Sequence, residues 1–216
     1  MRKILSELFL LVLIFILPGC NRISLSELNL DTECDIMIRD GVDKEYELIT
    51  DEIIHSNILN LIVETLNGNR IKVRKEGAIN YLNTKEIQIE INSDKIYNIY
   101  FGNYLDNTIL DYLGDPCITI DDGNNKEHYF LDNELYSYVS FLLNHNTNII
   151  EVKVYRITEN QISVGRDDES DSYFSINYEK LPNEIEVGTK VEIKLAKATK
   201  DKKGLWIESI CLKKEV

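Results

Sequence analysis

Aromatic and acidic residues gather in the middle of the chain, between positions 97 and 115. Aromatic rings beside carboxylates bind sugars or cationic peptides, and paired carboxylates cleave glycosidic bonds. Tyrosine is also a good strand residue and aspartate is common in turns, which is the simpler explanation. The candidate ligand-binding residues are Tyr97, Tyr100, Tyr104 and Tyr112, and the neighbouring carboxylates are Asp106, Asp111 and Asp115.

A second acidic segment places Asp167, Glu169 and Asp171 at alternate positions. Such side chains supply the oxygen ligands that Ca²⁺ prefers. An EF-type loop requires glycine at its sixth position, where this chain has Ser172, and no bidentate glutamate follows in register. We interpret the segment as a solvated hairpin loop and keep calcium as the alternative.

Catalytic and cofactor signatures are missing from the sequence. It contains no HExxH, GxSxG or SxxK motif and no glycine-rich phosphate loop. The three histidines are far apart in sequence and share no ligand spacing. We therefore expect a protein without a metal or cofactor, and we expect that it is not an enzyme.

The N-terminal segment has the features of an export signal. Arg2 and Lys3 precede an unbroken apolar run over residues 8–17, which ends at Leu17-Pro18-Gly19-Cys20. A helix of that length spans about 15 Å, roughly half of a hydrocarbon core, so it is too short to anchor the chain. The closing tetrad resembles the lipobox of bacterial lipoproteins. The resemblance implies that Cys20 becomes the N-terminal residue and carries a diacylglyceryl group on the outer face of the cell membrane.

The charge distribution limits the classes of partner that the protein can bind. The chain has a net charge of −13, and removal of residues 1–19 takes away two basic residues and one acidic residue, leaving −14. Residues 20–147 carry net −13 and residues 148–216 carry net −1. This composition argues against nucleic acid and anionic lipid surfaces as partners and favours a basic protein or peptide.

Periodicity predicts an α+β domain over residues 34–147, after a tether over residues 20–33. Apolar residues at helical spacing after Asp51 predict one helix, and a second helix follows Asp132 or Asn133. Short alternating segments predict a mostly antiparallel sheet on which both helices pack. The predicted strands cover residues 35–39, 46–49, 71–73, 87–91, 96–101, 117–120 and 127–131.

The pattern of residues 148–216 predicts strands and no helix. Five alternating segments lie at residues 150–157, 161–164, 173–178, 190–195 and 205–213, and five strands in so short a span can close into a barrel. Their spacing, with the turn at Glu186-Val187-Gly188-Thr189-Lys190, resembles the small OB-like barrels at the C-terminus of uncharacterised Gram-positive lipoproteins. The resemblance implies a two-module surface lipoprotein.

The remaining cysteines leave two alternatives. With Cys20 lipidated, three cysteines remain, so at least one is unpaired in a monomer. Either Cys34 and Cys117 form a bridge while Cys211 is buried in the last strand, or all three are small buried residues.

Two functions remain. The favoured one is a membrane-anchored extracytoplasmic protein that acts as a non-enzymatic binding or interaction module. The alternative is a cell-envelope hydrolase that uses carboxylate residues. A cleft with convergent carboxylates would favour the enzyme, and a shallow acidic surface that bears aromatic rings would favour binding.

Overall fold

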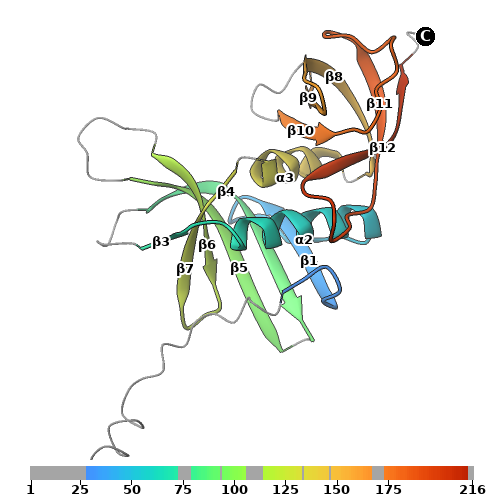
Figure 1. Ribbon diagram of the computed structural model, residues 1–216. Coiled ribbons are helices and arrows are strands. Elements are labelled where there is room, and N and C mark those ends of the chain that lie inside the picture. Colours follow the sequence, from blue (N-terminus) through green and yellow to red (C-terminus); the bar gives the residue numbers. More distant parts are fainter. Residues whose placement is uncertain are drawn as a thin grey trace, which may run out of the picture.

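The computed structural model describes residues 28–72, 79–92, 94–105, 114–132, 134–145, 147–166 and 173–213. These residues form a seven-stranded sheet with two helices, followed by a closed five-stranded barrel (Figure 1). The prediction of an α+β part followed by a small OB-like barrel is confirmed.

The sheet has the strand order β2-β1-β4-β5-β6-β7-β3, and every neighbouring pair is antiparallel. Its two edge strands are only two residues long, which limits the row of unpaired backbone groups at each edge. The strands are β1 (Cys34–Asp40), β2 (Glu47–Leu48), β3 (Arg70–Ile71), β4 (Ile79–Ile91), β5 (Lys95–Tyr104), β6 (Asp115–Asp121) and β7 (Lys126–Phe130).

Helix α2 (Glu52–Leu66) forms where its apolar spacing and N-terminal cap coincide. The Asp51 side chain accepts hydrogen bonds from the backbone N–H groups of Ile53 at 2.8 Å and Ile54 at 3.0 Å. Ile54, Ile58 and Ile62 follow one another on one face and are fully buried. Helix α3 (Glu134–His145) packs beside it.

Strand β4 is longer than expected, because it begins at Ile79 rather than near Ile87. Its register against β5 shifts between Tyr81 and Glu86, so a bulge separates its two halves. Gly102 of β5 permits the first half to approach, since a Cβ atom there would lie 2.8 Å from the backbone oxygen of Asn80. The polar sequence before Ile87 concealed this half of the strand.

The barrel has the circular strand order β10-β12-β11-β8-β9. Strands β10 and β12 are parallel, and the other neighbouring pairs are antiparallel. Closure removes the exposed edges that five short strands would otherwise present. The strands are β8 (Ile149–Ile157), β9 (Gln161–Gly165), β10 (Phe174–Asn177), β11 (Lys190–Leu195) and β12 (Leu205–Leu212).

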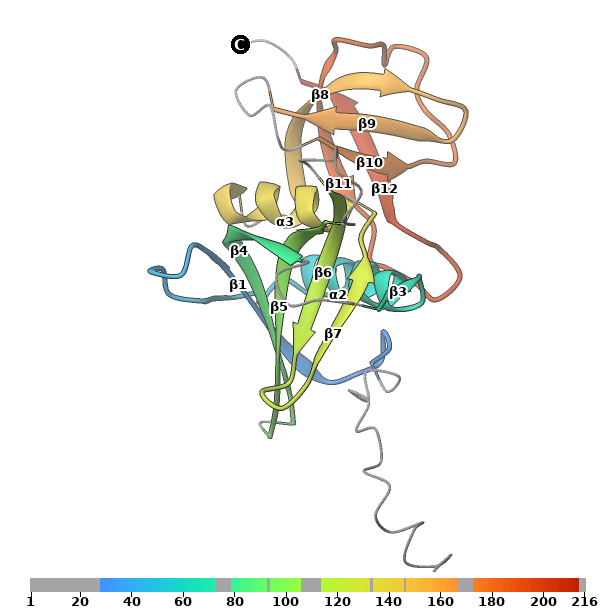
Figure 2. The ribbon, with the colours of Figure 1, turned by 90° about the vertical axis from the view of Figure 1, so that its left-hand side faces the viewer.

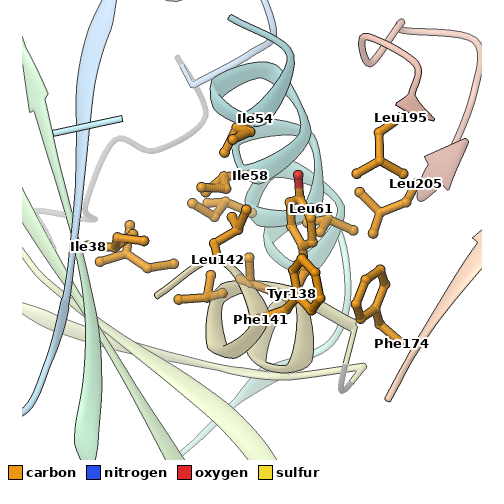
Figure 3. Packing of buried hydrophobic residues seen from close by; sticks show 14 of the residues in the cluster. Ile38, Ile54, Ile58, Leu61, Tyr138, Phe141, Leu142, Phe174, Leu195 and Leu205 are labelled. Carbon is orange, nitrogen blue, oxygen red and sulfur yellow. The ribbon is translucent and has the colours of Figure 1, made fainter. Parts of the chain in front are cut away.

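The sheet part and the barrel share a continuous apolar core through the helices. Phe174 of β10 contacts two rings of α3 edge to face, Tyr138 at 5.7 Å and Phe141 at 5.5 Å between ring centroids. Leu195 and Leu205 of the barrel lie on the same side, close to Tyr138 (Figure 3). All five side chains are buried, so the two parts are joined by packing as well as by the chain.

Polar contacts also connect the two parts, where α2 meets the loop after β11. We call this contact the joint. The Asn57 side chain donates to the Ala196 carbonyl at 3.2 Å, and the Ala198 N–H donates to Ser56 Oγ at 3.2 Å. The Gly204 N–H donates to Glu64 Oε1 at 2.9 Å. Backbone groups in the loop between β11 and β12 thus form hydrogen bonds with side chains of α2, and these bonds fix the orientation of the barrel.

The segment before β1 also contributes side chains to the core. Leu28 is buried and Leu30 packs against the core, although both lie in the segment predicted as a tether. No helix among the described residues is both long and apolar enough to cross a membrane.

Candidate functional site

The sheet has one face that the helices cover and one that they leave open. Along β5, Tyr97, Ile99 and Phe101 are buried, and Phe101 contacts Tyr136 of α3 at 5.2 Å between ring centroids. Residues at the alternate positions point to the other face. That face is turned toward the viewer in Figure 2, with α2 behind it. We call it the open face.

The candidate tyrosines are divided between the two faces. Tyr97 is 5% exposed and belongs to the core, so the structure removes it from the candidate site. Tyr100 and Tyr104 both lie on the open face. Tyr112 lies outside the described residues, as do Asp106 and Asp111.

Two aromatic side chains that sequence reasoning missed join Tyr100 and Tyr104. Tyr81 meets Tyr100 edge to face at 6.1 Å between ring centroids, and Phe130 meets Tyr104 at 6.3 Å. Tyr81 is 39% exposed and Phe130 is 38% exposed, so both present apolar ring surface to solvent. These four rings are the aromatic patch of the open face.

A charged group lies beside the aromatic patch. Arg39, Glu86 and Tyr100 are cross-strand neighbours on β1, β4 and β5. Arg39 Nε donates to Glu86 Oε2 at 2.8 Å, and the Tyr46 hydroxyl donates to the same oxygen at 2.9 Å. The Arg39 guanidinium also lies 4.5 Å from the centre of the Tyr46 ring. The Glu86 carboxylate therefore links β4 to β1 and to the loop after β1, which carries Tyr46.

Burial, followed by the charge of Glu86, raises the pKa of Tyr100. Burial and the hydrogen bond to Glu86 raise the pKa of Tyr46. Both phenols are neutral at physiological pH, so they offer hydrogen bonds and ring faces rather than charge. Nearby, Thr119 Oγ1 lies 2.8 Å from His128 Nδ1, and burial lowers the pKa of that histidine, which makes it neutral as well.

The cysteine alternatives are settled in favour of free thiols. Cys34, Cys117 and Cys211 are all unbridged. Cys34 on β1 and Cys117 on β6 are three strand spacings apart in the sheet, so at least about 14 Å separates them, which no disulfide spans. The expectation that Cys211 is buried is wrong, because it is exposed on the outer surface of β12.

Cys34 and His55 lie together, although twenty-one positions separate them. His55 Nε2 is 2.8 Å from the Cys34 carbonyl oxygen and 3.9 Å from its Sγ. Burial, with a contribution from Asp35, raises the pKa of the Cys34 thiol to about 11. A protonated thiol is a poor nucleophile, so this pair is better explained as a link between β1 and α2 than as a catalytic dyad.

A cavity of about 310 Å³ lies at the joint, and Glu64, Asp132, Glu134 and Lys203 line it. Burial, followed by the charges of Asp132 and Glu64, raises the pKa of Glu134 to about 7. Among the described residues, no group of three or more His, Cys, Asp or Glu side chains is arranged to hold a metal ion. The calcium candidates Asp167, Glu169 and Asp171 lie outside those residues, as does Cys20.

Replacing Glu134 by glutamine is expected to stabilise the protein at pH 8 by about 2 kcal/mol. This is less than the free energy that corresponds to the full pKa shift, because the group is partly solvated. A carboxyl whose pKa is raised from 4.5 to about 7 on folding costs stability as the pH rises between those values. The gain should therefore vanish near pH 4.5. Denaturant unfolding at both pH values measures it, with Glu159→Gln on an exposed barrel turn as the control; equal gains at the two pH values would contradict the assignment.

Comparison with known protein families, curated proteins and solved structures finds no match. The aromatic patch joins the two remaining sequence candidates, Tyr100 and Tyr104, to Tyr81 and Phe130, which the structure places beside them.

Proposed function

We propose that this protein is a lipid-anchored extracytoplasmic binding protein that holds a partner on the open face without catalysis. One observation carries the proposal. The aromatic patch brings Tyr81 and Phe130 together with Tyr100 and Tyr104 on the sheet face that the helices leave open. Solvent-exposed aromatic rings on a rigid scaffold are the side chains that contribute most to protein interfaces.

The chemistry of this surface favours a basic protein or peptide. Residues 20–147 carry net −13, which attracts cations over the whole domain. Lysine and arginine side chains also bind over aromatic rings, so the patch and the charge favour the same kind of partner. Anchoring through Cys20 supports the proposal, because it would hold this surface in the envelope, within reach of other membrane-bound proteins.

The hydrolase remains a second candidate because of the joint cavity. A carboxyl with a pKa of about 7 can donate a proton at neutral pH, and Glu64 and Asp132 lie near it. Glu64 Oε1, however, accepts hydrogen bonds from the Gly204 N–H and from the Asn60 side chain. These contacts give Glu64 a structural role at the joint, and binding is the function that the geometry supports better.

The binding proposal predicts that a double substitution of Tyr81→Ala and Phe130→Ala weakens binding of a decalysine peptide about five- to thirtyfold, because loss of ring contacts and cation–π attraction costs about 1–2 kcal/mol. Tyr173→Ala is the matched control, since Tyr173 is 41% exposed but lies on the barrel. Association should also slow as ionic strength rises from about 0.01 M to about 0.15 M, where the Debye length falls from about 30 Å to about 8 Å. Surface plasmon resonance measures both effects, and equal affinities for the double variant and the control would contradict the proposal.

A further inference from the structure

The aromatic patch consists of two ring pairs, and each pair has a carboxylate beside it. Tyr81 and Tyr100 form the first pair, at 6.1 Å between ring centroids. Tyr104 and Phe130 form the second pair, at 6.3 Å and with an angle of 88° between the ring planes. The two pairs differ in whether a cation of this chain already binds the neighbouring carboxylate.

Lys126 is the cation beside the first pair. Its ammonium group lies 3.1 Å from Asp121 Oδ2. The hydrogen bond to Asp121 raises the pKa of Lys126 most, and the phenols of Tyr81 and Tyr100 add to the shift, so the ammonium group lies near both of them. A lysine ammonium group is thus already held between a carboxylate and the first ring pair on the open face.

Asp115 is the corresponding carboxylate of the second pair. It lies directly opposite Tyr104 where β5 pairs with β6, and side chains in that position share a face of the sheet. Cys117, two positions along β6 on the same face, lies opposite Phe130 of β7. Burial, with a contribution from the charge of Asp115, raises the pKa of the Cys117 thiol to about 11, in agreement with this placement. Asp115 therefore lies beside both rings.

Asp115 differs from Asp121 in its partners. Its side chain is exposed, and among the described residues it forms neither a salt bridge nor a hydrogen bond. The Phe130 ring beside it is 38% exposed. An accessible carboxylate next to two rings that meet at nearly a right angle offers a cation both hydrogen-bond acceptors and aromatic surface. This half of the patch is complementary to a cation that the partner supplies.

We propose that Asp115, Tyr104 and Phe130 bind the ε-ammonium group of a lysine side chain of the partner. The inference rests on the proposed function and names the chemical group that the open face recognises. An ammonium group fits because it carries three N–H donors for the carboxylate and a compact charge for the rings. Lys126 is held by the same kinds of group in the first half of the patch. A trimethylated lysine keeps the attraction to the rings but has no N–H donor for Asp115.

Calorimetric titration of the full-length protein with decalysine and with its ε-trimethylated form tests the proposal. The wild type should bind decalysine about three- to tenfold more tightly, because methylation removes a charge-assisted hydrogen bond at a partly exposed site. Asp115→Asn should weaken binding of decalysine by a similar factor and remove the difference between the two peptides. Asp94→Asn is the matched control, since Asp94 is exposed in the turn between β4 and β5 and its replacement removes the same charge. Thermal unfolding of both variants verifies that they fold.

The outcomes separate this inference from the proposed function. Suppose that decalysine binds and that Tyr81→Ala with Phe130→Ala weakens it, but that Asp115→Asn binds as tightly as Asp94→Asn. The open face would then hold the partner without this ammonium site, and the inference would be overturned alone. Equal or tighter binding of the trimethylated peptide by the wild type would also overturn it, because Asp115 would then accept no N–H bond from the ligand. Failure of the wild type to bind decalysine would overturn both proposals.

Discussion

Replacing Phe174 by alanine is expected to lower the free energy of unfolding by about 3–5 kcal/mol, the usual cost of removing a buried phenylalanine. Phe174 is 3% exposed and contacts both Tyr138 and Phe141, so its ring connects the barrel to α3. The cavity left behind would open between the barrel and α3, close to Leu195 and Leu205 (Figure 3). The structure cannot close that space without moving the barrel.

Tyr173→Ala supplies the matched control, because Tyr173 precedes Phe174 and is 41% exposed. Its loss should cost clearly less than that of Phe174, about 1–2 kcal/mol, since part of its ring is exposed to solvent although it packs against Tyr155 and Gly165. Urea unfolding followed by circular dichroism measures both changes. A loss below about 1 kcal/mol for Phe174→Ala would mean that the barrel and the sheet are not held together by this contact.

Replacing Cys20 by alanine is expected to abolish lipid attachment, because no other residue at that position can form the thioether to a diacylglyceryl group. Two acyl chains at about 0.8 kcal/mol per buried CH₂ hold a protein on a membrane permanently, and without them the net charge of −13 gives no attraction to anionic lipid. The variant should therefore carry no lipid label and be absent from the anchored membrane fraction.

Metabolic labelling with a fatty-acid probe, followed by membrane fractionation, measures this loss. Cys211→Ala is the control, since Cys211 is a free and exposed thiol that the lipobox interpretation leaves unmodified. Equal label on the wild type and on Cys20→Ala would show that the lipobox resemblance is misleading.

Local signals in the sequence were sufficient for the helices and for the barrel. Helix α2 combines an apolar stripe with Asp51 at its N-terminus, and both signals lie within sixteen residues. The barrel strands alternate clearly and are separated by turns, so their bounds could be predicted to within a few residues. The first half of β4 lacks such alternation, and only pairing with β5 reveals it.

The candidate site was only partly predictable. Tyr97 and Tyr100 differ by three positions, and in a strand an odd separation places side chains on opposite faces, so their division was already present in the sequence. Tyr81 and Phe130 reach the patch through pairing of β4 with β5 and of β6 with β7. Such long-range register depends on tertiary packing and leaves no local pattern.

Site-directed photo-crosslinking tests the binding surface most directly. A benzoylphenylalanine residue in place of Phe130 puts the reactive ketone on the open face, and the same residue in place of Tyr173 puts it on the barrel. In cells that produce the full-length protein, irradiation should yield a discrete protein adduct from position 130 and none of that size from position 173. An adduct of the same size from both positions, or none from position 130, would contradict the proposal that the open face holds the partner.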